Sequence, residues 1–213
     1  MRPFLLALAL VSVRGAEAAK ASTHVDEAPV VVPPTFVAGF PGSILASTAD
    51  GERINGWVGT PGHRWTRCYS KSADGGNSAT FHQACDGKGP TVSIARLNSG
   101  RVIGGYASKS WASVGNWMGD EASFLFSLTY GFKHHFIGNQ PNYSQYSQSS
   151  YGPTFGGGHD WHVNGELKGG YCYIGYTFTC RIGNNGGLDV VCRNDFCGSY
   201  DQWKVDDLEV WIK

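Results

Sequence analysis

The sequence lacks an excess of either charge, since 17 basic and 17 acidic side chains balance over its 213 residues. Nucleic acids and anionic membranes are bound largely through clustered cations, so this balance predicts neither kind of partner. Charged side chains of either sign are also scarce, at 16% of the residues, whereas 13% are aromatic and 30 residues are glycine. This composition is typical of a turn-rich β protein rather than of a mainly helical one.

Long apolar runs are missing as well. A membrane-spanning helix needs roughly 20 apolar residues, and the concentrated run at residues 4–13 is too short for that. Arg2 precedes this run, and the small residues of Ala16-Glu17-Ala18 follow it. That order is typical of a signal peptide over residues 1–18, so we expect cleavage and export to the secretory lumen or the medium. The alternative is a buried N-terminal strand or helix.

The chain that remains after cleavage is long enough for one domain with a sizeable core. It keeps 195 residues with 15 basic and 16 acidic side chains, because Arg2, Arg14 and Glu17 lie in the removed segment. Residues 19–41 are rich in proline and valine, which predicts an extended leader, with an edge strand as the alternative. Residues 42–213 form the predicted domain.

Capping residues and hydrophobic patterns predict the elements of this domain. Short helices are expected over residues 47–57 and 77–85, because each begins with residues that favour the N-cap position. From Pro90 onward the apolar residues follow a period of two, which predicts strands. The predicted strands are one through Val92 and Ile94, and residues 65–70, 102–107, 122–128, 134–137, 171–178, 188–192 and 205–212. The expected fold is mainly β, an antiparallel β-sandwich with two short helices.

Six cysteines in an exported chain are interpreted first as disulfides. They are Cys68, Cys85, Cys172, Cys180, Cys192 and Cys197. Six cysteines allow 15 pairings, among which a sequence alone does not choose. Proximity along the chain favours Cys172 with Cys180 and Cys192 with Cys197, which leaves Cys68 with Cys85.

Several sequence blocks recur in a characteristic order from residue 81 to residue 211. They are FHQACDGKGPT at 81–91, GGYAS at 104–108 followed by Trp111, EASFLFSL at 121–128, FGGGHD at 155–160 and DLEVW at 207–211. In this order and at these spacings the sequence resembles the TLDc domain family, and it is similar to secreted, protist-like members. The resemblance extends from about residue 42 to residue 211, and it too implies a β-sandwich.

The family resemblance implies oxidation resistance and, in several members, binding to the cytosolic sector of the vacuolar proton pump. An exported domain lies on the wrong side of the membrane for that pump. We therefore expect a secreted, non-enzymatic TLDc module that binds a protein or glycan partner without a cofactor. The alternatives are a secreted hydrolase, a thiol enzyme that consumes peroxide, and a structural component of a wall, coat or matrix.

The enzyme alternatives depend on three residues. Glu121 and Glu209 match acidic positions of the family, and paired carboxylates would suit a glycosidase. Cys85 follows His82 at helical spacing, so the two could form a nucleophile and base. For all three residues a structural role is preferred, because each belongs to a segment that is predicted to be buried.

The block Gly156-Gly157-Gly158 precedes three candidate binding residues, His159, Asp160 and Trp161. The glycines do not predict a phosphate site, because a strand rather than a helix is expected after them. A metal site is not predicted either. His159 and His162 are three residues apart, which on a strand places them on opposite faces.

The remaining aromatic residues could form a sugar-binding surface. Trp117, Trp161 and Trp203 match no family position, and the uncharged segment 143–151 contains several tyrosines. The sequence Asn142-Tyr143-Ser144 is a glycosylation sequon. In an exported glycoprotein such a sequon is used on a polar surface loop.

Overall fold

The computed structural model describes residues 37–199 and 202–213. All of them belong to the second of two units into which the chain divides, Met1–Thr35 and Phe36–Lys213. The predicted signal peptide and most of the predicted leader lie outside the described residues.

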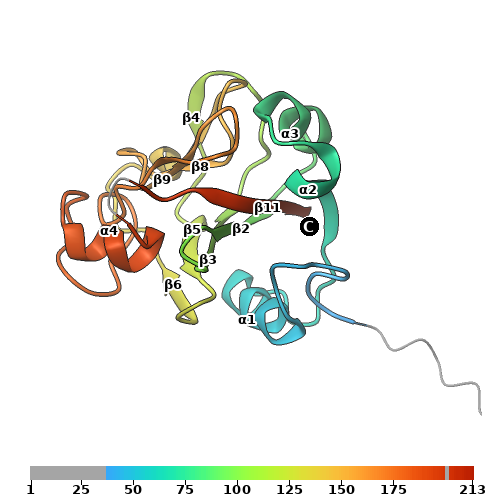
Figure 1. Cartoon of the computed structure of the whole chain (residues 1–213), viewed down its shortest axis with the longest axis horizontal. Coiled ribbons are helices and arrows are strands. Elements are labelled where there is room, and N and C mark those ends of the chain that lie inside the picture. Colours follow the sequence, from blue (N-terminus) through green and yellow to red (C-terminus); the bar gives the residue numbers. More distant parts are fainter. Residues whose placement is uncertain (1–36, 200–201) are drawn as a thin grey trace, which may run out of the picture. The chain divides into compact units, whose positions relative to one another are not determined.

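Two antiparallel sheets form the domain (Figure 1). The six-stranded sheet has the order β1 (Thr66–Ser70), β11 (Val205–Ile212), β2 (Thr91–Leu97), β3 (Val102–Ala107), β5 (Phe124–Ser127) and β6 (Phe132–His134). The five-stranded sheet has the order β10 (Gly170–Tyr171), β9 (Trp161–Val163), β8 (Thr154–Phe155), β7 (Gln145–Ser147) and β4 (Asn116–Met118). The expected fold class, a mainly β sandwich, is confirmed.

The two predicted helices are present with the expected caps. In α1 (Thr48–Val58) the Ser47 side chain accepts from the backbone of Asp50 in a capping box, and Gly59 ends the helix in the left-handed conformation. In α3 (Ser78–Cys85) the side chain of Asn77 caps the first turn. The structure adds α2 (Lys71–Asp74), α4 (Val190–Cys197) and the 3₁₀ turn η1 (Pro141–Ser144).

Two of the predicted strands are wrong, and the strand expected over residues 134–137 lies earlier, at Phe132–His134. Residues 188–192 contain the start of α4, because the Asp189 side chain accepts from the backbone N–H groups of Val191 and Cys192 and so caps a helix. The strand expected over residues 171–178 ends at Tyr171. Beyond it Gly175 has a φ of 102°, and the following N–H groups bond to a buried carboxylate instead of a neighbouring strand.

Three disulfides form, and all six cysteines take part. The pairing of Cys68 with Cys85 is as predicted. The other predicted pairing is wrong, because the bridges join Cys172 to Cys197 and Cys180 to Cys192. Cys192 and Cys197 are five residues apart on α4, so they project from different sides of the helix and do not meet.

Buried clusters cover both faces of the six-stranded sheet. One cluster fills the space between the sheets and includes Leu125 and Trp161. The other includes Ile54 of α1 and Phe126 of β5 and so lies between the sheet and α1. Every residue of β5 is buried, which confirms the prediction of a strand covered on both faces. In the five-stranded sheet, Phe155 of β8 and Trp161 and Val163 of β9 belong to the cluster between the sheets.

Candidate functional site

Aromatic residues line the outer face of the five-stranded sheet, with contributions from several strands. The strand register places Trp117 of β4 opposite Tyr146 of β7, and His162 of β9 between Thr154 of β8 and Tyr171 of β10. These residues point outward because successive side chains of a strand alternate between faces and the neighbours of His162 are in the core. We call the aromatic face the set Trp117, Tyr143, Tyr146, Tyr151, His159, His162, Tyr171 and Tyr173.

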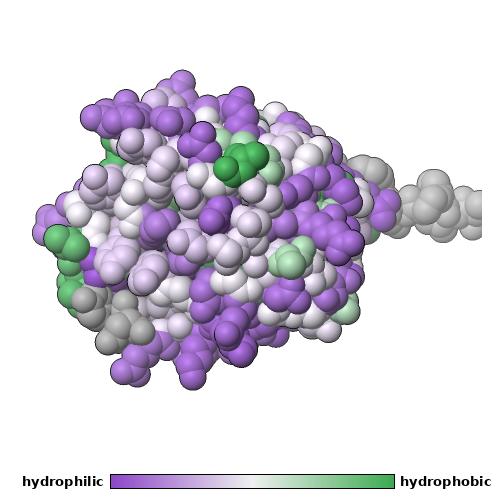
Figure 2. All heavy atoms as spheres, turned by 90° about the horizontal axis from the view of Figure 1, so that it is seen from above, coloured by the Kyte–Doolittle hydropathy of each residue, from purple (hydrophilic) through white to green (hydrophobic). Residues whose placement is uncertain are grey.

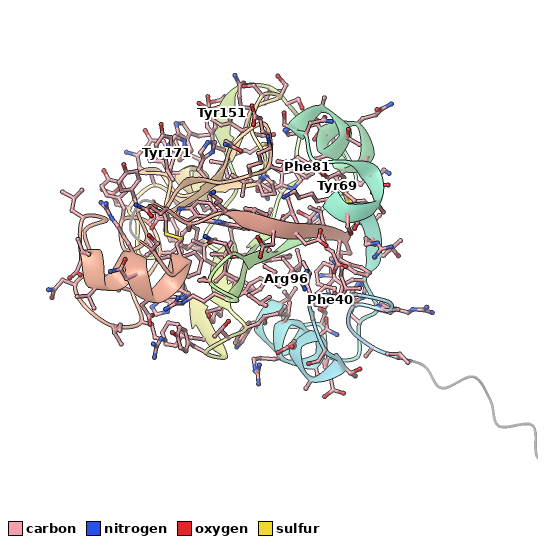
Figure 3. All side chains as sticks on the ribbon, in the orientation of Figure 1. Phe40, Tyr69, Phe81, Arg96, Tyr151 and Tyr171 are labelled. Carbon is pink, nitrogen blue, oxygen red and sulfur yellow. A yellow bond between two sulfur atoms is a disulfide. The ribbon has the colours of Figure 1, made fainter. Side chains whose placement is uncertain are left out.

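The rings of the aromatic face form a connected array. Ring centroids are 4.6 Å apart for Trp117 and Tyr146, and 4.4 Å apart for Tyr151 and His162. Tyr171 continues the array from His162 at 5.5 Å, with an angle of 23° between the ring planes. In Figure 3, Tyr151 and Tyr171 lie at the top of the domain, on the side opposite Phe40 and α1. The array is therefore remote from the α1 side of the fold.

The glycine-rich loop sets His159 at the centre of the array. His159 has a φ of 59°, and its backbone N–H bonds to the carbonyl of Gly156 at 2.9 Å. Its ring lies 5.1 Å from that of His162 and 6.0 Å from that of Trp117. The prediction that His159 and His162 point to opposite faces is wrong, because His159 lies in a turn before β9 and not on the strand.

Asp160 holds this loop from inside the protein. Its carboxylate is fully buried and accepts from the backbone N–H groups of four successive residues, 175–178. Burial raises the pKa of Asp160 to about 6, and these hydrogen bonds oppose the rise. Gly156 is required beside it, because a Cβ there would lie 2.0 Å from Oδ1 of Asp160. Asp160 therefore positions the loop and is not accessible to a partner.

The three tryptophans that were expected at the surface lie in different places. Trp161 and Trp203, expected at the surface, are buried in the core cluster between the sheets. Trp117 is half-buried in the aromatic face. The sequence does not predict Tyr171 and Tyr173 as members of this face, because the pattern over residues 171–178 indicates one long strand. The closely spaced tyrosines at 171, 173 and 176 were the signal that could have indicated them. His162, which was also missed, is buried at 4% exposure in contact with the rings of Tyr151 and Tyr171.

Electrostatically the aromatic face is nearly neutral. Burial lowers the pKa of His159, and it lowers the pKa of His162 to about 4 with a smaller effect from His159. Both imidazoles are therefore uncharged at neutral pH. The Nε2 atom of His159 is buried and has no hydrogen-bond partner within the described part of the chain. The buried guanidinium of Arg193 lies 4.2 Å from the Tyr173 ring centroid.

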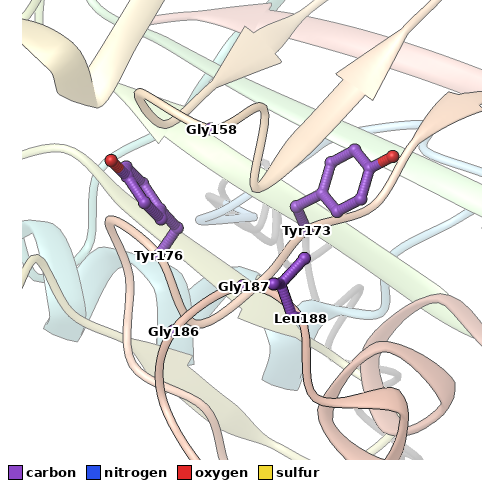
Figure 4. Close-up of a pocket in the computed structure, with 6 residues that line it drawn as sticks. All are labelled: Gly158, Tyr173, Tyr176, Gly186, Gly187 and Leu188. Carbon is purple, nitrogen blue, oxygen red and sulfur yellow. The ribbon is translucent and has the colours of Figure 1, made fainter.

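Two cavities adjoin the aromatic face. In Figure 4, Tyr173 and Tyr176 stand on either side of an apolar cavity of about 300 Å³, with Leu188 below them. A second cavity of about 510 Å³ is polar and is lined by Tyr143, Tyr176 and the amide side chain of Gln140, among others. Among residues 37–199 and 202–213, no charged side chain lines either cavity. They extend the surface that an uncharged ligand could contact.

The catalytic candidates are not brought together. Glu209 is fully buried and accepts from Ser43 Oγ at 2.5 Å and from the backbone N–H of Ile44 at 3.2 Å. It thereby fastens residues 43–44 to β11. Glu121 is exposed and lines a separate cavity in which Glu209 has no part. Neither arrangement provides the paired carboxylates that the hydrolase alternative needs.

The thiol alternative is wrong for Cys85, because that residue is bonded to Cys68. The ring of His82 is also engaged. Its Nδ1 lies 2.7 Å from Oδ1 of Asp86, and its Nε2 lies 2.9 Å from the carbonyl oxygens of Gln148 and Tyr151. His82 therefore ties α3 to the segment that carries Tyr151, which is a structural role.

Three further observations concern modification, metals and membranes. Asn142 is exposed on η1, where its side-chain amide is accessible. Within residues 37–199 and 202–213, no three His, Cys, Asp or Glu side chains gather as metal ligands would. In the same part of the chain, every helix is too short or too polar to span a bilayer.

Comparison with known proteins relates this fold and its glycine-rich loop to one family. Residues 44–212 match the TLDc domain. The mTOR-associated protein MEAK7 of Gallus gallus is 33% identical over 110 residues, which are 46% of this chain and 22% of that protein. MEAK7 of Danio rerio is 31% identical over 64 residues, 30% of this chain and 14% of that protein. The chain thus covers less than a quarter of these curated relatives. On the match over residues 44–212, the chain belongs to the TLDc domain family.

Proposed function

We propose that this chain is an exported, non-enzymatic TLDc module that binds a neutral glycan on its aromatic face. The connected array of Trp, Tyr and His rings is the observation that carries the proposal. Sugar rings have apolar C–H faces, and stacking them on aromatic rings removes both surfaces from water. Phenol hydroxyl groups at the edges of the tyrosine rings would supply hydrogen bonds to sugar hydroxyls.

Because the aromatic face is nearly neutral, an uncharged glycan is favoured over a charged partner. A polyanion or an acidic peptide would require cations, and none of the described residues that line the cavities beside the face is a cation. The surface in Figure 2 has only small, separate green areas. A large obligate protein interface is usually more hydrophobic than that.

Export is part of the proposal, and two features support it. The N-terminal residues have the order of a signal peptide. The three disulfides suit an oxidising compartment and would be unusual in a reducing cytosol. A role in oxidative-stress protection would then not use a free thiol, because no cysteine of this chain has one in this state.

A protein partner is the second candidate. The relatives bear the name mTOR-associated protein. By analogy with that name, this chain would bind a protein. Locating the native chain by immunostaining and fractionation tests export, whereas binding arrays separate a glycan from a protein partner. If the protein is found in the cytosol with free thiols, export is refuted. If it is found in the lumen or the medium without free thiols, export is supported.

The glycan is tested by screening the disulfide-bonded chain on arrays of neutral and charged oligosaccharides and on surface proteins. We expect binding to one group of neutral glycans in the micromolar range, with weak dependence on salt because no ion pairs form. Binding only to charged glycans or proteins, or to nothing, would contradict the proposal. A structural wall or coat component, the remaining alternative, would instead be found insoluble in the native material.

A further inference from the structure

A third cavity lies apart from the residues of the aromatic face and is lined in part by α1. It has a volume of about 190 Å³ and is lined by residues of α1, β3, β5 and β6. The aromatic side chains of Trp57, Tyr106 and Phe124 form much of its wall. The Trp57 and Phe124 rings meet edge to face with centroids 6.2 Å apart. This cavity therefore offers aromatic rings beside polar groups to a small ligand.

Lys133 contributes a cation to the cavity. Its Nζ atom donates to the backbone carbonyl of Trp57 at 3.1 Å and lies 4.3 Å from the centroid of the Phe124 ring. No carboxylate of residues 37–199 or 202–213 lies within 4.0 Å of it. An ammonium group has three N–H donors, and the carbonyl uses one of them. Lys133 is thus a half-buried cation without a counterion.

Glu121 contributes an anion to the same cavity. Its carboxylate is exposed at the edge, and among the described residues it has neither an ion pair nor a side-chain hydrogen bond. Two opposite charges therefore line one small aromatic cavity without pairing with each other. His135 also lines the cavity, but its Nδ1 lies 3.5 Å from Thr179 Oγ1. This leaves the Lys133 and Glu121 charges as the groups available to a ligand.

We propose that this cavity binds a small zwitterion, namely a free amino acid with an apolar side chain. The ligand carboxylate would meet Lys133, its ammonium group would meet Glu121, and its side chain would pack on the rings of Trp57, Tyr106 and Phe124. A ligand with both charges balances the site, whereas a ligand with only one leaves a site charge unpaired. The proposal does not depend on the glycan site, since the two sites share no residue.

The test uses isothermal titration of the whole disulfide-bonded chain with L-leucine. N-acetyl-L-leucine lacks the ammonium group, and L-leucinamide lacks the carboxylate. We expect L-leucine to bind with a Kd of about 1 mM or tighter and each derivative to bind about ten-fold more weakly. If L-leucine does not bind, or binds no better than both derivatives, the proposal is overturned.

Two variants assign the charges. Lys133→Met keeps an unbranched apolar stem over Phe124, so the fold should be retained, and it should weaken L-leucine about ten-fold while L-leucinamide is unaffected. Glu121→Gln should weaken L-leucine but not N-acetyl-L-leucine. Glu166→Gln, which removes an exposed carboxylate paired with Lys168 elsewhere, is the matched control and should change nothing. Unchanged L-leucine affinity in folded Lys133→Met would overturn the assignment.

Discussion

The six-stranded sheet and the five-stranded sheet differ in what covers their second face. The six-stranded sheet packs against the other sheet on one face and against α1 on the other, so its side chains are fixed by packing. The five-stranded sheet has strands of only two or three residues, and its outer face carries rings that are partly exposed. The comparison indicates that stability and binding are assigned to different sheets, and substitutions in each should therefore have different effects.

Gly104→Ala should have the largest effect on stability. A Cβ at this position of β3 would lie 2.1 Å from the backbone carbonyl oxygen of Ser93 and 2.4 Å from the Phe126 ring. The backbone of a paired strand has no room to shift. We therefore expect the free energy of unfolding to fall by more than about 4 kcal/mol, or no folded protein to form. Denaturant unfolding measures this loss. Gly56→Ala in α1, where nothing lies within 4 Å, is the control and should stabilise by about 0.5–1 kcal/mol.

Asp160→Ala should have the next largest effect, because it leaves four buried N–H groups of residues 175–178 without an acceptor. We expect the free energy of unfolding to fall by about 3 kcal/mol. Asp160→Asn keeps one oxygen and should lose less. Equal stability of wild type and Asp160→Ala would show that the carboxylate does not hold the loop that places His159.

Acidification should destabilise the domain through its buried histidines. Burial lowers the pKa of His134 and of His162 to about 4, so both favour folding above pH 6.5 and lose that contribution as the pH falls toward 4. Asp160, whose pKa is raised to about 6, acts in the opposite direction. We expect a net loss of about 2 kcal/mol between pH 6.5 and about pH 5.

His134→Gln tests this pH dependence. His134 is buried and bonds through Nδ1 to the carbonyl of Thr179 at 2.6 Å, and an amide can replace that donor without titrating. The variant should lose less than about 1 kcal/mol over the same pH range. An unaltered pH profile in the folded variant would assign the acid sensitivity to other groups.

Tyr171→Ala should have the smallest effect on stability. Its side chain is 54% exposed and lies at the edge of the five-stranded sheet. We expect the free energy of unfolding to change by about 0.5 kcal/mol or less. A loss near that of Asp160→Ala would mean that the aromatic face is structural, and the contrast between the two sheets would fail.

Much of the six-stranded sheet could be predicted because its signals are local. The apolar residues of β5 and the caps of α1 each specify their element within a few residues. The blocks that resemble the TLDc family fall largely on this sheet and on the glycine-rich loop. Packing on both faces leaves little freedom there, so the sequence pattern and the structure agree.

The five-stranded sheet and α4 could not be predicted in the same way. Strands as short as β8 and β10 have no period to detect, and their pairing joins segments from 116 to 171. His159 faces His162 only because its backbone is left-handed. The pairing of Cys172 with Cys197 depends on which side of α4 Cys197 occupies. Residues 188–192 alternate as a strand would, so the sequence did not predict this helix.

The central claim is that the outer face of the five-stranded sheet binds the partner. The most direct test is isothermal titration of a neutral glycan found on the array against wild type and the double variant Trp117→Ala, Tyr171→Ala. Tyr130→Ala removes an exposed tyrosine outside the aromatic face, 41% exposed against 54% for Tyr171, and is the control. We predict that the double variant keeps its fold and loses at least about ten-fold in affinity, while Tyr130→Ala binds as wild type does. Undiminished binding by a folded double variant would contradict the account.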